Sequence, residues 1–233
     1  MKKVLIITLG VVLVAAALII SRHQPAPAAG AVYQGRTAQE WLGEVFTTNQ
    51  AAAFQAFRAM GTNGLPAIVH GFEYRDSAWA KFYQRIYPKL PAMWQRRHSP
   101  PVSEQAMRSS AGLLLLNTGQ QDARPILPAL VKLLAEKDQP ARGAILSAST
   151  HLFRPGDSDY VPILAQCFAD PNNYVRLPAA TCLASIGPAA KPAIPALTAA
   201  LKDPDLNLRL NAAWTLWQID HQTNAVTPAL REV

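Results

Sequence analysis

Two stretches of the sequence decide the fold: DPNNYVRLPAATCLASIG, Asp170–Gly187, and DPDLNLRLNAAWTLWQID, Asp203–Asp220. The second begins 33 residues after the first and copies its order of polar, apolar and small residues. At this offset identical residues align as follows: Pro162 with Pro195, Leu164 with Leu197, Asp170 with Asp203, Arg176 with Arg209, Leu183 with Leu216, and Ile186 with Ile219. A fixed period of this length indicates an array of structural repeats.

Each repeat has the pattern of two amphipathic helices. In the first helix Leu197, Ala200 and Leu201 share one face, at spacings i, i+3 and i+4. In the second helix an apolar face runs from Leu208 to Ile219, with small alanines that allow close helix packing. The Asp-Pro dipeptide between them ends the first helix and caps the second. Neither helix can bury its apolar face alone, so the repeats must stack.

Weaker copies of the repeat precede these two. The segment LPALVKLLAEKDQPAR, from Leu127, aligns with VPILAQCFADPNNYVR, from Val161, at an offset of 34 residues. Segments that begin at Ala56 and Ala111 have the same order of second helix, turn and next first helix. We therefore expect about five helical pairs in a repeat domain that covers residues 36–230. The fold class predicted is all-α, an α-solenoid of stacked antiparallel helix pairs.

The first 22 residues have the pattern of one membrane or signal helix. Lys2 and Lys3 precede Val4–Ile20, a run of seventeen uncharged residues. A helix of this length spans roughly 26 Å, the short end of what a bilayer requires. The positive-inside rule places its N-terminus in the cytoplasm. We expect a single-pass inner-membrane anchor for residues 1–22, with the body of the protein in a bacterial periplasm.

A cleaved signal peptide is the alternative, and the sequence leaves the choice open. Ala26–Ala28 supplies the small residues that a signal peptidase site requires, and cleavage would release the body into the periplasm. Residues 23–35, rich in proline and alanine, are predicted to be an extended linker. The folded part is then expected to open on a capping box, with Thr37 as the N-cap and Glu40 three residues on.

The repeat pattern resembles a known family. Pro-x-Leu, Asp-Pro, Val/Leu-Arg, Ala-Ala and Ile-Gly in this order are similar to HEAT-like repeats of the short kind, also seen in phycobilisome lyase-like proteins. The opening YQGRTAQEWL resembles exported bacterial HEAT-repeat proteins. The resemblance implies a structural ladder in which a second-helix arginine reaches the aspartate of a neighbouring turn. Its residues here are Asp170, Arg176, Asp203 and Arg209.

The sequence carries none of the common catalytic or metal-binding motifs. The five histidines are more than a helical turn apart, and the sequence contains no HExxH motif and no glycine-rich phosphate loop. We therefore expect no metal and no cofactor. Cys167 and Cys182 fall on inward positions of the two helices of one pair. Two alternatives stay open for them: buried thiols that fill the core, or a disulfide permitted by an oxidising periplasm.

One basic and aromatic segment, residues 71–101, departs from the repeat pattern. Its candidate partner-binding cations are Arg85, Lys89, Arg96 and Arg97. Its apolar residues Trp79, Phe82, Tyr83 and Ile86 are spaced as one helix face, which predicts that they pack inward beneath solvated cations. A nucleic-acid-binding surface and a membrane-proximal surface attracted to anionic lipid are the alternatives. The net charge of the chain is +7, yet residues 101–233 hold eleven basic and eleven acidic residues. The basic excess therefore lies entirely in the N-terminal part.

Repetition favours a long binding surface over a single catalytic centre. The primary hypothesis is a non-catalytic scaffold, tethered to the membrane by its N-terminal helix, that binds an unidentified protein partner. An enzyme is the alternative, either lyase-like or centred on the basic segment. A nucleic-acid-binding repeat protein is the second alternative, and both export and the neutral C-terminal half argue against it.

Overall fold

The computed structural model describes residues 30–95, 102–136 and 140–221, without the side chains of residues 120 and 121. The predicted anchor or signal segment, residues 1–22, lies outside the described residues. Ala31–Val233 form one unit, distinct from Met1–Gly30. Within the described ranges, no helix combines the length and the apolar character needed to cross a membrane.

A short hairpin opens the folded unit. Strand β1 (Val32–Tyr33) pairs antiparallel with β2 (Arg36–Thr37). The two turn residues, Gln34 and Gly35, have φ angles of 50° and 75°, the left-handed region that a tight hairpin turn requires. Paired backbone thus begins at Val32, inside the segment that the sequence predicted to be linker, residues 23–35. The predicted capping box is confirmed at the start of helix α2 (Ala38–Gly43).

Helices α3 (Gln50–Met60), α4 (Leu65–Glu73) and α7 (Glu104–Asn117) follow, with the 3₁₀ helix η1 (Gly61–Gly64) between the first two. Helix α4 packs against α7, and α2 packs against both. Gly71 makes this contact possible. A Cβ atom there would lie 2.7 Å from Leu42 Cδ2 and 2.9 Å from Ala111 Cβ, so any side chain would force the helices apart.

An arm leaves this group of helices between α4 and α7. It consists of α5 (Ala78–Ile86), η2 (Tyr87–Lys89) and α6 (Ala92–Gln95). None of these three elements contains a buried residue. The prediction that Trp79 and its neighbours pack inward is therefore wrong. Helical spacing shows that α5 has an apolar face, but it does not show that another helix covers that face.

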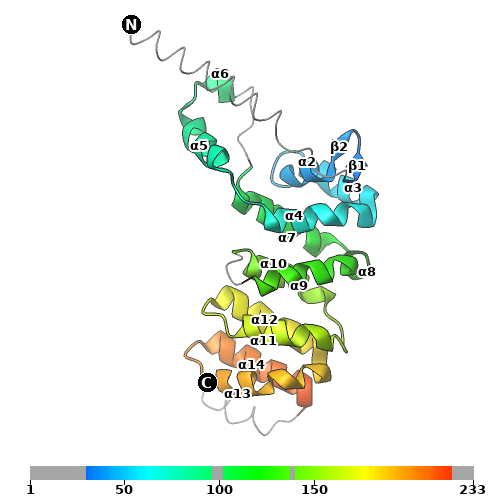
Figure 1. Cartoon of the computed structure of the whole chain (residues 1–233), viewed down its shortest axis with the longest axis vertical. Helices are drawn as coiled ribbons and strands as arrows, with labels where there is room; N and C mark the ends of the chain where they lie inside the picture. The colour runs from blue at the N-terminus through cyan, green and yellow to red at the C-terminus, as the bar shows by residue number, and fades with distance from the viewer. Residues whose placement is uncertain (1–29, 96–101, 137–139, 222–233) are drawn as a thin grey trace. The chain divides into compact units, whose positions relative to one another are not determined.

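The remaining helices form successive pairs (Figure 1). Their bounds are α8 (Gln120–Ala123), η3 (Arg124–Ile126), α9 (Leu127–Ala135), α10 (Arg142–Ser149), η4 (Thr150–Leu152), η5 (Ser158–Tyr160), α11 (Val161–Phe168), α12 (Asn173–Ile186), η6 (Gly187–Ala193), α13 (Ile194–Ala200) and α14 (Leu206–Asp220). Second helices pack on one another, α10 on α12 and α12 on α14. The coarse prediction of an all-α helical solenoid is confirmed.

Proline marks the start of the first helix in each pair. Pro66, Pro128, Pro162 and Pro195 all lie in the first turn of a first helix, directly after a 3₁₀ helix. Proline fits there because the first-turn N–H groups have no partner within the helix. These prolines therefore recur along the chain because each helical pair begins with one.

The repeat register also predicts which side chains are buried. The equivalent leucines Leu183 and Leu216 are 0% and 5% exposed, and Ile186 and Ile219 are buried beside them. Lys202, in the turn after α13, is exposed. The apolar side chains of all the pairs belong to one continuous core.

Candidate interaction site

Arginine–aspartate pairs join consecutive helical pairs. Arg176 Nη2, on α12, lies 2.6 Å from Asp203 Oδ2, in the turn between α13 and α14. Arg142 Nη1, on α10, lies 2.5 Å from Asp170 Oδ2, in the turn between α11 and α12. Each pair connects a second helix to the next repeat. Asp170 therefore pairs with Arg142 rather than with Arg176 of its own repeat.

The ladder has a different form at Arg209, on α14. Its Nη1 donates to the backbone carbonyls of Asp203 at 2.9 Å and Pro204 at 3.2 Å, within its own repeat. No aspartate of a following turn reaches it within the described residues. Among the described residues, Arg209 thus binds the backbone of its own Asp-Pro turn.

A third aspartate pair lies earlier in the chain, and the sequence did not predict it. Arg124, in η3, contacts both carboxylate oxygens of Asp157, at 3.1 and 2.6 Å, and also donates to the Leu152 carbonyl. Burial alone would raise the pKa of Asp157, but the bonds from Arg124 and from the Arg154 N–H hold it below its usual value. Arg124 precedes a first helix, so the second-helix register gave no signal for it.

The prediction that the aspartate of Asp-Pro caps the second helix is wrong, because Asn172 caps α12 and Asp205 caps α14. Asp170 and Asp203 instead accept bonds from the backbone of their turns. The N–H of Asp205 donates to Asp203 Oδ1, and the N–H of Asn172 donates to Asp170 Oδ1, both at 2.9 Å. The Asp205 N–H, followed by Arg176, lowers the pKa of Asp203. A carboxylate that accepts bonds from a backbone amide and a guanidinium is a poor proton donor at neutral pH. This arrangement is suited to holding repeats together rather than to acid–base chemistry.

Cys167 and Cys182 are both buried free thiols in the structure. Arg142 Nη2 donates to Cys167 Sγ at 3.2 Å, so one guanidinium contacts both the thiol and Asp170. Burial raises the pKa of both thiols. Both side chains fill core space in this structure, and buried thiols with raised pKa values are poor nucleophiles.

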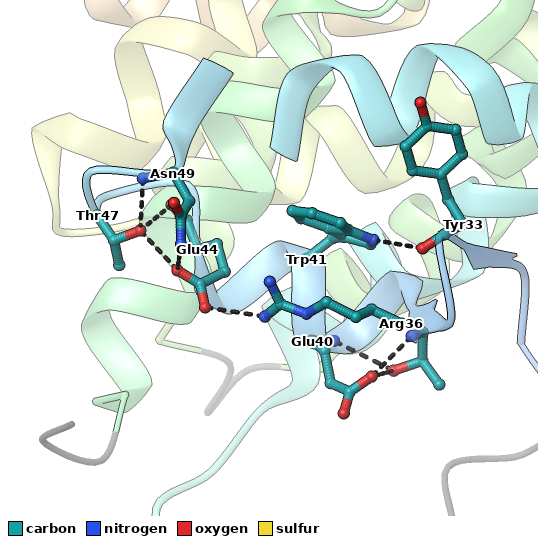
Figure 2. A network of polar contacts seen from close by, with 8 residues as sticks. Tyr33, Arg36, Glu40, Trp41, Glu44, Thr47 and Asn49 are labelled. Carbon is teal, nitrogen blue, oxygen red and sulfur yellow. Dashed lines mark hydrogen bonds and ion pairs between the residues drawn. The ribbon is translucent and has the colours of Figure 1, made fainter. Parts of the chain in front are cut away.

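A polar network fixes the N-terminal hairpin on α2 (Figure 2). Trp41 Nε1 donates to the Tyr33 carbonyl at 3.0 Å, and the Arg36 guanidinium lies 4.3 Å from the centre of the Trp41 ring. Arg36 Nη2 also contacts Glu44 at 2.8 Å. Bonds from Thr47 and then Arg36 lower the pKa of Glu44. The network thus links the hairpin to α2 and to the turn that follows α2.

The predicted partner-binding cations lie on the arm or outside the described residues. Arg85 and Lys89 are exposed on α5 and η2. Arg96 and Arg97 fall outside the described residues. Neither Arg85 nor Lys89 forms an ion pair with any described residue.

Equivalent exposed positions recur on the stacked second helices. Ser147 on α10, Thr181 on α12 and Trp214 on α14 occupy the same place in the repeat, at offsets of 34 and 33 residues. All three are exposed, and Trp214 is 57% exposed. We call this side of α10, α12 and α14 the second-helix face. The centre of the Trp217 ring lies 5.2 Å from that of Trp214, so α14 adds two tryptophans to this face.

Comparison with protein families gives one informative result. Residues 160–233 match the family described as HEAT repeats. The match supports a HEAT-like repeat protein. It covers α11 to α14, which hold the Arg176–Asp203 pair and the α12 and α14 part of the second-helix face, and it spans less than half of the chain. Comparison with curated proteins gives no significant match.

Proposed function

We propose that this chain is a non-catalytic scaffold that binds a protein partner through its second-helix face. HEAT repeats generally mediate protein interaction, which is consistent with this role. The observation that carries the proposal is the row of exposed, repeat-equivalent positions that ends at Trp214, with the exposed Trp217 ring beside it. Tryptophan is enriched among the residues that dominate binding energy at protein interfaces.

The proposal includes a membrane tether. Residues 4–20 hold the scaffold on the inner membrane, and the repeats lie on the periplasmic side. The uncharged run, the two lysines that precede it and the proline-rich segment that follows it support this arrangement. A reporter that is active only in the periplasm, fused after Val233, should be active. Activity of a cytoplasm-only reporter at the same position would contradict the tether and its orientation.

The binding surface is tested by substitution in the full chain. Pro228, Ala229 and Leu230, beyond the described residues, copy Pro195, Ala196 and Leu197, so the repeat register continues past α14. A truncation near the C-terminus would remove part of this repeat pattern, so a loss of binding could not be assigned to the second-helix face. Trp214→Ser should remove partner proteins from pull-downs of solubilised membranes while the helical content stays unchanged.

Tyr174→Ser is the matched control. Tyr174 is 83% exposed on α12, but it lies outside the row of Ser147, Thr181 and Trp214. Its substitution should leave partner capture intact. Equal capture by both variants would contradict the proposed surface. Unchanged capture with reduced thermal stability of Trp214→Ser would assign Trp214 to the protein's own packing.

A further inference from the structure

The arm, residues 77–95, is held to the repeat body at its root by reciprocal bonds. The Asp76 N–H donates to Glu104 Oε2 at 3.2 Å, and the Glu104 N–H donates to Asp76 Oδ1 at 3.1 Å. The second oxygen of Asp76 accepts from Gln84 Nε2, on α5, at 3.2 Å. Asp76 is the only acidic residue from Arg75 to Gln95, and two of these bonds engage its carboxylate. Because Asp76 precedes the arm, the arm itself contains no acidic side chain.

The far end of the arm has its own internal structure. Tyr87 Oη donates to the Gln95 carbonyl at 3.0 Å, and Gln95 Nε2 donates to the Leu90 carbonyl at 2.9 Å. These bonds fold α6 back on η2. Ser77 caps α5 by accepting from the Ala80 N–H at 3.0 Å. The arm thus keeps helical structure without a packed core, since its three elements have no buried residue.

Large apolar side chains stay exposed on the arm. Trp79 is 38% exposed and Phe82 is 40% exposed, with their rings in edge-to-face contact at 5.2 Å. Met93, on α6, is 70% exposed. Among the described elements, α5 packs substantially only on η2, and Figure 1 shows α5 and α6 standing apart from the stacked pairs. Such a concentration of apolar surface on a small element indicates a binding site.

Cations flank the aromatic face of the same helix. At 100° per residue, Arg85 lies about 60° and Lys81 about 100° from Phe82, both on the side of Phe82 that is away from Trp79. Both are exposed, as is Lys89, and none of the three forms an ion pair with a described residue. An aromatic face bordered by unpaired cations, without acids, is the pattern of helices that lie in a membrane interface.

We propose that the arm lies on an anionic lipid bilayer, with Trp79 and Phe82 in the headgroup region and Lys81, Arg85 and Lys89 paired with lipid phosphates. The charge of the arm, three cations and no acid, is complementary to such a surface. An acidic protein would satisfy the cations but leave the aromatic face exposed, so the bilayer is the partner that engages both the cations and the aromatic side chains. The inference rests on the proposed tether, which would keep the arm close to the membrane.

A fluorescent probe at position 82 tests the inference in the full chain. The native thiols Cys167 and Cys182 are buried, so Phe82→Cys offers a single accessible site for the environment-sensitive dye NBD. Tyr174→Cys, on α12, provides the control position, and the wild-type chain reports background labelling. Vesicles of phosphatidylcholine alone are compared with vesicles that also contain phosphatidylglycerol.

With the anionic vesicles, the probe at position 82 should shift to the blue, gain emission several-fold and be quenched by doxyl-labelled lipid. The probe at position 174 should not respond. Neutralising Lys81, Arg85 or Lys89 with glutamine should raise the phosphatidylglycerol content needed for the response, because each cation near the surface contributes about fivefold in affinity. High salt should have the same effect.

Separate measurements test the proposed tether and the proposed membrane contact of the arm. Flotation of the chain with neutral as well as anionic vesicles, insensitive to salt, reports the tether. A shift of the position-82 probe that depends on phosphatidylglycerol reports the arm. Flotation without that shift, or equal shifts at positions 82 and 174, would overturn the inference. A shift with soluble polyglutamate but none with anionic vesicles would overturn it in favour of an acidic protein partner.

Discussion

The guanidinium of Arg176 lies 2.6 Å from the carboxylate of Asp203, 27 residues later in the chain, and connects the second helix of one repeat to the turn of the next. The side chains are 20% and 14% exposed, so solvent screens the pair only in part. Because the pair joins two repeats, it stabilises their stacking as well as each repeat. Arg209, at the equivalent position, has no such cross-repeat contact within the described residues.

Replacing Arg176 should therefore destabilise the protein more than replacing Arg209. Arg176→Ala leaves the largely buried Asp203 carboxylate without its cation, at an expected cost of about 1.5–3 kcal/mol in the free energy of unfolding. Arg209→Ala removes only bonds to backbone carbonyls of its own turn and should cost less. Urea denaturation of both variants, followed by circular dichroism, measures the difference. An equal or larger loss for Arg209→Ala would contradict the cross-repeat role of Arg176.

The Asp203 pair predicts a specific sensitivity to acid. The pKa of Asp203 is lowered in the folded state, so its contribution to stability is complete above the ordinary aspartate pKa of about 4. It is lost as the pH falls through the lower, folded-state value. Melting temperatures measured from pH 7 down to pH 2 should fall more steeply for the wild type than for Asp203→Asn. Parallel curves would show that the carboxylate does not stabilise the fold.

The register predicts equal burial for equivalent leucines. Leu183→Ala and Leu216→Ala should each cost ~2–5 kcal/mol, because each leaves a cavity in the continuous core. Lys202→Ala, at an exposed position, should change stability by no more than about 0.5 kcal/mol. Denaturant melts rank the three variants. A larger effect for Lys202→Ala than for either leucine would show that the buried and exposed positions have been assigned the wrong way round.

Two glycines offer a matched test of helix packing. A Cβ at Gly143, on α10, would lie 2.8 Å from the Tyr174 carbonyl oxygen, on α12, a backbone atom that cannot move aside. Pro178 has no N–H to donate to that carbonyl, so the Tyr174 carbonyl accepts no helical hydrogen bond from position 178 where α10 approaches α12. Gly143→Ala should destabilise by about 1–3 kcal/mol.

Gly112→Ala is its control. The nearest atom to a Cβ at Gly112, on α7, is Ala148 Cβ at 3.9 Å, an ordinary contact distance. In the middle of a helix this substitution should stabilise by up to about 1 kcal/mol, because alanine is the better helix former. Thermal melts of both variants should therefore move in opposite directions. A neutral Gly143→Ala would show that α10 and α12 are not in close contact.

The repeat period made the helical part of the fold predictable from sequence. Identical residues 33 apart fix the phase of both helices, so the burial of Leu183 and the direction of Arg176 follow from it. Features outside the period gave no such signal. The hairpin at Val32–Thr37 has strands of two residues, too short for an alternating pattern. Arg124 precedes a first helix, so its pairing with Asp157 falls outside the second-helix register.

The arm shows a different limit of sequence reasoning. The spacing of Trp79, Phe82 and Ile86 correctly indicates an apolar helix face on α5. Periodicity describes a helix by itself, whereas burial depends on which other element packs against it. The arm lacks the 33-residue copy that identifies neighbours elsewhere in the chain. Its exposure could therefore be seen only in three dimensions.

Site-specific photo-crosslinking tests whether the protein binds its partner through the second-helix face. A photoreactive amino acid is placed in the full chain at Thr181 or Trp214, on the face, and at Lys202 or Tyr174 as exposed controls. Irradiated membranes are then analysed for adducts. We expect one adduct of defined mass from positions 181 and 214, and none from positions 202 and 174. Adducts from the control positions alone, or no adduct from either position on the face, would contradict it.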